Sequence, residues 1–346
     1  MVAKTIAMLV GIGLTLLLFG KFASRYRFPT MILLVVGSAT FLADAANGAI
    51  RYSRAQGGQL TTQGEHHLAY SSLGETATLV SNYLQGGKRA GARLSGVRSY
   101  ETAIAAKGRE DVLVITAESL GVFKNPADQL AFQRQIAEAL GVQPQFATET
   151  SNGVTIDGEL RVLCRTGFGA VDVSIAKVKG DCLPHVFDRA GYVTVATHAY
   201  FGDFYKRTER YPALGFARMR FLHDGKDRRC SGAFESGCDE DVLRELLATP
   251  AQPGQHRFLY QMTIETHLPE PACAGASEPM DAYRCRHLNY FRKLGAALRT
   301  VDRPMRVVIA GDHPPPFPRA ELRKQFRPHQ VTFLTFEVKP AKAAKG

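Results

Sequence analysis

The stretch VLVITAESLG, residues 112–121, decides the fold, because a short β-rich apolar run leads directly into a polar turn. Four further runs have the same apolar character: YVTVAT (192–197), RFLYQMTI (257–264), MRVVIAG (305–311) and VTFLTFEV (331–338). Helical patterns lie between the runs, at residues 125–140, 204–214, 239–247, 282–298 and 319–326. This alternation predicts an α/β fold with a mostly parallel central sheet flanked by helices on both faces.

Chemically capable side chains follow four of these strands. In chain order they are Glu118, His198, Thr266 with His267, and Asp312 with His313. Open α/β sheets bind ligands at the carboxyl ends of their strands. Each residue alone is compatible with an ordinary loop, but their recurrence at one edge of the sheet predicts a functional site there. Glu118, Asp312 and His313 carry the oxygen and nitrogen donors that hold Zn²⁺ or Mn²⁺.

A candidate nucleophile lies in the stretch SNGVTIDGELRVLC, residues 151–164. Ile156, Leu160 and Leu163 have the spacing of one helix face, which predicts a short helix beginning near Thr155. The free N–H groups at a helix start bind an oxyanion or a phosphate. The alternative is that Thr155 is only the N-cap of this helix.

Two runs without charge open the chain, at residues 5–20 (TIAMLVGIGLTLLLFG) and 28–43 (FPTMILLVVGSATFLA), each of 16 residues. We predict two N-terminal membrane helices, which span a bilayer with the help of flanking residues. Lys21, Arg25 and Arg27 lie between the runs. The positive-inside preference therefore places this loop in the cytoplasm and the rest of the chain outside. The alternative is that residues 1–23 are a cleaved signal peptide, which also exports the rest.

The composition, with 45% hydrophobic and 22% charged residues, is that of a folded chain. The net charge of +11 permits nucleic-acid binding, but an exported chain meets anionic lipid headgroups first, so we expect a membrane and no nucleic acid as partner. Six cysteines follow the apolar N-terminus, and short loops favour neighbour pairing. The predicted disulfides join Cys164 to Cys182, Cys230 to Cys238 and Cys273 to Cys285.

These features divide the chain into four predicted parts. Residues 1–48 form a membrane anchor of two helices, and residues 49–110 form a connector with one helix over 73–84. Residues 111–338 form the exported catalytic α/β domain, and residues 339–346 form a disordered basic tail. The predicted location is the inner (cytoplasmic) membrane, with the catalytic domain facing the periplasm or the outside of the cell.

Five motifs, in this order, resemble those of a known family: AESLG (117–121), GVTIDGEL (153–160), FYKRTERYPALGF (204–216), TIETHLP (263–269) and GDHPPP (311–316). They are similar to the motifs of the alkaline-phosphatase superfamily, in its membrane-anchored, sulfatase-like branch of phosphoethanolamine and phosphoglycerol transferases. GVTIDG resembles the phosphoglycerol branch more, whereas neighbour-paired disulfides resemble the phosphoethanolamine branch. The sulfatase signature Cys/Ser-x-Pro-x-Arg is absent, since CLPHV at 182–186 lacks the arginine, and formylglycine chemistry is therefore not expected.

The resemblance implies a ligand set of Glu118, Thr155, Asp312 and His313, with Thr155 also the nucleophile. The implied ion is a divalent metal, Zn²⁺ or Mn²⁺, with Mg²⁺ as a further option.

The resemblance also implies substrate contacts. Arg207 matches an arginine that contacts the phosphoryl or glycerol group of the donor, and Tyr205 lines the same pocket. The alternative for Arg207 is a helix-surface arginine paired with Asp203 or Glu209. His198 and His267 match histidines that face the substrate phosphate or a second metal position, and either is a candidate to protonate the departing oxygen.

The implied function is metal-dependent transfer of phosphoglycerol or phosphoethanolamine from a phospholipid donor to a cell-envelope glycan or lipid acceptor. The threonine would attack the phosphodiester and leave a phosphothreonine intermediate. Two alternatives stay open. One is a phosphodiesterase or phosphatase-type hydrolase on the same scaffold, in which water resolves the intermediate, and the other is a non-catalytic envelope-binding relative.

Overall fold

The structure is a computed structural model that describes residues 94–151, 154–166, 182–223, 226–230, 236–267, 273, 275–317 and 319–340. The chain divides into two compact units, Met1–Ser81 and Asn82–Gly346, and all described residues belong to the second. The predicted membrane helices, the predicted connector helix and residues 341–346 of the predicted tail lie outside the described residues. Within the described residues, no helix has the length and apolar character needed to cross a membrane.

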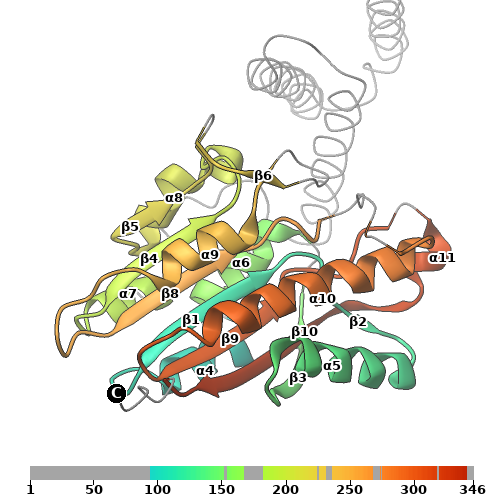
Figure 1. Ribbon diagram of the computed structural model, residues 1–346, viewed down its shortest axis with the longest axis horizontal. Coiled ribbons are helices and arrows are strands. Elements are labelled where there is room, and N and C mark those ends of the chain that lie inside the picture. Colours follow the sequence, from blue (N-terminus) through green and yellow to red (C-terminus); the bar gives the residue numbers. More distant parts are fainter. Residues whose placement is uncertain are drawn as a thin grey trace, which may run out of the picture. The chain divides into compact units, whose positions relative to one another are not determined.

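Eight strands form one central sheet: β1 (Asp111–Ala117), β2 (Gly121–Phe123), β3 (Gln145–Thr150), β4 (Val193–His198), β5 (Arg218–Arg220), β8 (Arg257–Met262), β9 (Met305–Gly311) and β10 (Phe326–Val338). The order across the sheet is β2-β10-β9-β1-β8-β4-β5, and β3 pairs with β10 (Figure 1). Neighbours from β9 to β5 run parallel, as predicted, which confirms the α/β fold. The sheet is mixed, however, because β10 runs antiparallel to β2, β3 and β9.

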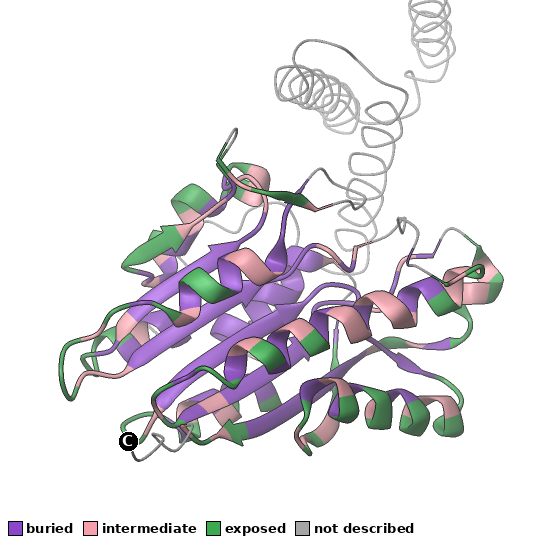
Figure 2. Ribbon diagram, in the orientation of Figure 1, coloured by how far each residue is buried: buried purple, intermediate pink, exposed green. Residues whose placement is uncertain are grey.

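The helices that pack on the sheet are α4 (Arg98–Ala105), α5 (Pro126–Leu140), α6 (Thr155–Cys164), α7 (Leu183–Asp188), α8 (Arg207–Leu214), α9 (Asp239–Leu247) and α10 (Pro279–Leu298), and the short α11 (Ala320–Arg323) precedes β10. One apolar core joins the sheet to α5, α9 and α10, and a second joins its other face to α4, α6, α7 and α8. Figure 2 shows the sheet buried between these layers. The side chains of β1 alternate between the two cores, as strand geometry requires: Leu113 and Ile115 enter the first, and Val112 and Val114 enter the second.

Local sequence signals explain the predicted helix over 125–140. Asn125 caps α5 by accepting the N–H of Ala127 at 2.9 Å, Pro126 occupies the first turn, and Gly141 ends the helix with a φ of 72°. The predicted helix over 204–214 is interrupted: a 3₁₀ turn, Phe204–Lys206, precedes α8, and Tyr205 and Lys206 have positive φ. The helix α4 falls within the predicted connector, yet its buried face packs against the second core.

All three predicted disulfides are confirmed. Cys164–Cys182 joins the end of α6 to the start of α7, and Cys230–Cys238 links the small hairpin of β6 (Arg229–Cys230) and β7 (Ser236–Gly237) to α9. Cys273–Cys285 ties the segment after β8 to α10. Each pair therefore holds a connection next to a helix start or a strand end.

Candidate metal centre

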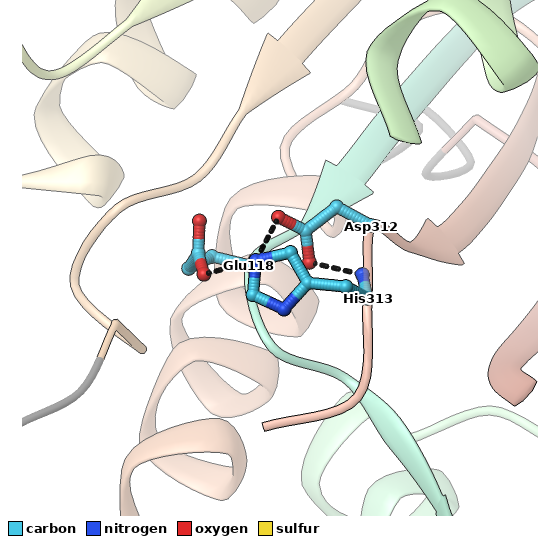
Figure 3. A group of neighbouring side chains, drawn as sticks. All are labelled: Glu118, Asp312 and His313. Carbon is cyan, nitrogen blue, oxygen red and sulfur yellow. Dashed lines mark hydrogen bonds and ion pairs between the residues drawn. The ribbon is translucent and has the colours of Figure 1, made fainter. Parts of the chain in front are cut away.

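The carboxyl ends of β1 and β9 bring three predicted ligands together. These strands are parallel neighbours, and Ala117 lies opposite Gly311, so the residues that follow them are adjacent. Glu118, Asp312 and His313 are buried, and one ligand atom from each lies within 4.8 Å of the others (Figure 3). His313 Nε2 lies 3.3 Å from Glu118 Oε1 and 3.2 Å from Asp312 Oδ2.

The donor set fits a divalent cation. Asp312 Oδ1 accepts the N–H groups of Ser119 at 2.8 Å and His313 at 2.6 Å, whereas the buried Oδ2 accepts no hydrogen bond from any described residue. His313 Nδ1 lies 2.9 Å from the carbonyl oxygen of Pro314, an acceptor that places the ring proton on Nδ1. His313 Nε2 then presents its lone pair to the carboxylates, as a metal-binding imidazole does.

The cluster brings two buried carboxyl groups and an imidazole close together, and this shifts the pKa values of Asp312 and His313. Burial, followed by the charge of Glu118, raises the pKa of Asp312 to about 7. Burial alone would lower the pKa of His313, but the carboxylates of Asp312 and Glu118 outweigh it, and the net pKa is raised. Both shifts come from negative charge collected in a water-poor space, which a cation relieves.

The hydroxyl of Thr155 completes the cluster. Its Oγ1 lies 3.5 Å from Glu118 Oε2 and 3.4 Å from His313 Nε2. Thr155 is the first residue of α6, and the N-cap position belongs to Val154, so the interpretation of Thr155 as an N-cap is wrong. The first-turn N–H groups of α6, which have no partner inside the helix, start at the same point.

Close contact between α6 and the end of β9 fixes the position of Thr155. A Cβ added at Gly158 would lie 2.5 Å from Asp312 Cβ and 2.6 Å from Asp312 Cα, so only glycine permits this approach. Arg161 donates from Nη2 to the carbonyl oxygen of Gly311 at 2.5 Å and pairs with Glu149 of β3. The helix is therefore held by both packing and a buried ion pair.

Two predicted histidines differ in position: His267 lies beside this centre, whereas His198 ends β4, which is separated from β1 by β8. His267 is partly exposed, and its Nε2 lies 4.0 Å from Glu118 Oε1. His198 is fully enclosed, with Nδ1 3.0 Å from the carbonyl oxygen of Met262 and with no described hydrogen-bond partner for Nε2. Burial, and then the charge of Arg207, lowers the pKa of His198 well below its ordinary value, so this ring is neutral at pH 7.

Arg207 is fully buried and is paired with Glu159, not with Asp203 or Glu209. Its Nε lies 3.2 Å from both carboxylate oxygens of Glu159, which is one helical turn after Thr155. The guanidinium carbon of Arg207 also lies 5.2 Å from the centre of the Tyr205 ring. The structure thus pairs Arg207 of α8 with Glu159 of α6.

The sequence did not reveal several residues that surround the centre. Glu159 accepts the hydroxyl of Tyr211 at 2.5 Å and that of Tyr260 at 3.4 Å. The position of Glu159, four residues after Thr155, was a usable signal, because such residues share a helix face. No spacing rule connects Glu118 with α10, where His287 contacts its main chain.

A family description named Sulfatase matches residues 111–329. Among curated proteins, a putative cyclic beta-1,2-glucan modification protein of Rhizobium meliloti (strain 1021) is 26% identical over 180 residues, which cover 48% of this chain and 27% of that protein. The match therefore spans less than two thirds of the relative's own length.

Two solved structures are similar. The lipoteichoic acid synthase LtaP from Listeria monocytogenes has 18% identity and a TM-score of 0.48, with 71% of this chain and 69% of that chain covered. The Streptococcus pyogenes phosphoglycerol transferase GacH, in complex with sn-glycerol-1-phosphate, has 15% identity and a TM-score of 0.50, with 77% of each chain covered. At these identities the likeness concerns the fold alone.

Proposed function

The chain belongs to the sulfatase family, within the alkaline-phosphatase superfamily, and from this premise we propose that it transfers phosphoglycerol or phosphoethanolamine from a phospholipid to a cell-envelope acceptor. The observation that carries the proposal is the contact of Thr155 Oγ1 with two members of a buried carboxylate and imidazole cluster. Formylglycine chemistry stays excluded, because Cys182 is bonded to Cys164.

Thr155 is the proposed nucleophile. Glu118, Asp312 and His313 would hold a divalent cation, which would lower the pKa of the Thr155 hydroxyl and offset charge on the phosphoryl oxygens. Thr155 Oγ1 attacks the phosphorus in line, diacylglycerol departs, and the acceptor hydroxyl resolves the phosphothreonine ester. The first-turn N–H groups of α6 bind phosphoryl oxygens at the point of attack.

His267 is the proposed acid for the departing oxygen. It is partly exposed beside the cluster, whereas the neutral ring of His198 has no spare proton to deliver at pH 7. His198 Nε2 is enclosed in the structure, so we assign His198 no direct contact with the donor. Arg207 and Tyr205 border the donor position, with Arg207 supporting α6 through Glu159.

A glycan is the proposed acceptor, and a membrane phospholipid is the proposed donor. The relative named as a putative cyclic beta-1,2-glucan modification protein supports the glycan. The net charge of +11 and the three disulfides support an exported domain that works at an anionic lipid surface. Two membrane helices before it would anchor the domain there.

Labelled phosphatidylglycerol and phosphatidylethanolamine vesicles, with Zn²⁺ or Mn²⁺ and a cyclic glucan, provide the test. We expect diacylglycerol release, a labelled glucan and, when the acceptor is omitted, a peptide in which Thr155 carries phosphoglycerol or phosphoethanolamine. Mass spectrometry detects the last two products. Release of the free headgroup phosphate at the same rate without glucan would identify a hydrolase, and absence of label at Thr155 would overturn the nucleophile assignment.

A further inference from the structure

We infer that one turn of α10, carrying Tyr283 and His287, positions the metal ligand Glu118 through its main chain. The inference rests on the proposed metal site but not on the identity of donor or acceptor. Both residues are almost fully buried, and their polar side-chain atoms contact main-chain atoms of Glu118, Ser119 and Gly121. They act on the segment between β1 and β2, and are therefore positioning residues.

The main chain of Glu118 is bonded on both sides. Its N–H donates to Thr263 Oγ1 at 2.9 Å, and its carbonyl oxygen accepts the hydroxyl of Thr266 at 2.8 Å. His287 Nε2 approaches the same carbonyl oxygen at 3.2 Å. Two donors from different elements thus converge on one oxygen, which restricts rotation of the peptide that precedes Ser119.

The next residue has a backbone conformation that needs support. Ser119 has a φ of 60°, in the left-handed region that residues other than glycine rarely adopt. We call residues 118–121, where the chain passes from β1 to β2, the elbow. Tyr283 bridges this elbow, because its hydroxyl donates to the carbonyl oxygen of Ser119 at 3.1 Å and accepts the N–H of Gly121 at 3.3 Å. The elbow matters for the ligands, since Ser119 itself donates to Glu118 Oε1 from Oγ and to Asp312 Oδ1 from N.

The tautomer of His287 makes the inference testable. A carbonyl oxygen only accepts, so the bond to Glu118 requires the proton on Nε2, while Nδ1 lies 2.9 Å from the carbonyl oxygen of Tyr283. A neutral imidazole has one N–H. The negative charge of the cluster lies on the Glu118 side of the ring and favours the proton on Nε2.

Substitution of His287 by glutamine or by asparagine distinguishes the roles of its two ring nitrogens. The amide of glutamine reaches the place of Nε2, and the shorter asparagine reaches only that of Nδ1. His287→Gln therefore keeps the donor to Glu118, and His287→Asn loses it while keeping a polar group beside Tyr283. A role in packing alone predicts equal effects of the two substitutions, since both remove the ring that packs near Phe132.

The experiment titrates metal-stripped full-length protein with Co²⁺ and follows its visible absorption, with far-UV circular dichroism as a check of folding. We expect His287→Gln to bind within about threefold of the wild type, and His287→Asn and Tyr283→Phe to bind about 10- to 100-fold more weakly. Tyr290→Phe is the matched control on α10, because its hydroxyl donates to Gln261 and not to the elbow, and it should bind as the wild type does.

Equal losses in the two His287 variants, or wild-type Co²⁺ affinity in both His287→Asn and Tyr283→Phe, would overturn the inference. A wild-type protein that binds no Co²⁺ overturns it together with the proposed metal site. A wild-type protein that binds Co²⁺ but transfers no headgroup contradicts only the proposed function, so the two failures are distinguishable.

Discussion

Thr155 lies against the cluster without capping its helix, which changes the expected cost of removing its hydroxyl. Thr155→Ala should abolish transfer, while the free energy of unfolding should change by less than about 1 kcal/mol, because alanine is a good helix former and no capping bond is lost. Thr155→Ser keeps a hydroxyl and should retain part of the activity. Transfer assays and urea unfolding measure the two effects. Wild-type transfer by a folded, metal-loaded Thr155→Ala protein would falsify the nucleophile assignment.

Asp312 should make metal binding depend on pH. Burial and the charge of Glu118 raise its pKa to about 7 in the metal-free protein, so the carboxyl binds a proton below that pH. A cation must displace this proton and also that of His313, whose pKa is raised above 6.5, so the affinity should fall by at least about tenfold for each pH unit below 7. Calorimetric titration with Zn²⁺ from pH 5.5 to 8 checks this slope. Asp312→Asn should bind weakly at every pH, and a flat wild-type profile contradicts the expectation.

At the scale of elements, the contact between α6 and β9 should tolerate no added methyl group. Gly158→Ala places a Cβ against Asp312, so the helix must shift and carry Thr155 with it. We expect a loss of about 1–3 kcal/mol in the free energy of unfolding, together with weaker Co²⁺ binding.

Val162→Ala is the control for Gly158→Ala, because it removes buried packing on the same helix without a new clash at Asp312. It should lower the stability by a similar amount and leave the Co²⁺ affinity near that of the wild type. Chemical unfolding and Co²⁺ absorption provide the two measurements. Unchanged Co²⁺ binding in Gly158→Ala would show that the approach of α6 does not set the cluster.

The disulfide Cys273–Cys285 connects α10 to the segment after His267, and Arg286 Nη1 lies 3.4 Å from the carbonyl oxygen of His267. Replacing both cysteines by serine should therefore displace His267, the proposed acid, and lower the turnover number. The Co²⁺ affinity should stay near that of the wild type, since the proposed ligands Glu118, Asp312 and His313 belong to other segments. The Cys230–Cys238 pair, replaced in the same way, serves as control. Loss of Co²⁺ binding in the first variant would place the disulfide in support of the metal site instead.

The apolar runs of the sequence predicted the central elements well, because strands buried on both faces are continuously apolar. β3 and β5 were missed for the opposite reason: most of their residues are exposed or half-buried, so they form no apolar run. The relative direction of neighbouring strands was the other property that the sequence did not predict. An apolar run does not reveal whether its neighbour is parallel, and β10 proved antiparallel to β9.

The candidate site was predictable where residues follow strands and unpredictable where helices approach from the side. Glu118, Asp312 and His313 lie together because parallel strands end at one edge. The pairing of Arg207 with Glu159 depends instead on how α8 packs under α6, which no local pattern encodes. The same holds for His287, whose Nε2 faces the main-chain carbonyl oxygen of Glu118.

For the whole molecule, two buried acids should give the metal-free protein an unusual dependence of stability on pH. Burial, and then the charge of Glu265, raises the pKa of Asp239 to about 8, and the pKa of Asp312 is raised to about 7, both from 3.8. A raised carboxyl pKa stabilises the fold fully below the unfolded value, and this stability is lost as the pH rises through the folded value. The free energy of unfolding should therefore decrease as the pH rises to about 8, most steeply above pH 6.5, because below that pH the buried His198 and His287, whose pKa values are lowered, act in the opposite direction.

Urea unfolding at pH 6.5 and pH 8, with chelator and with Zn²⁺, measures this dependence. Zn²⁺ should restore the part that belongs to Asp312. Asp239→Asn should flatten the profile of the chelated protein, because the substituted amide does not ionise. A chelated wild-type protein that is more stable at pH 8 than at pH 6.5 would contradict the assignment.

The pairing of β1 with β9 has a consequence for when the protein can bind a metal during its synthesis. Ser119 and Asp312 are 193 residues apart, so their hydrogen bond closes most of the described chain into one loop. Contacts at such separation form late in folding, because the chain loses the entropy of closing the loop before the contacts contribute favourable free energy. A chain still being synthesised has Glu118 and Thr155 but lacks the other two members of the cluster. It should therefore capture no metal until the segment from Met305 to His313 has left the ribosome, and chains truncated before it should remain metal-free.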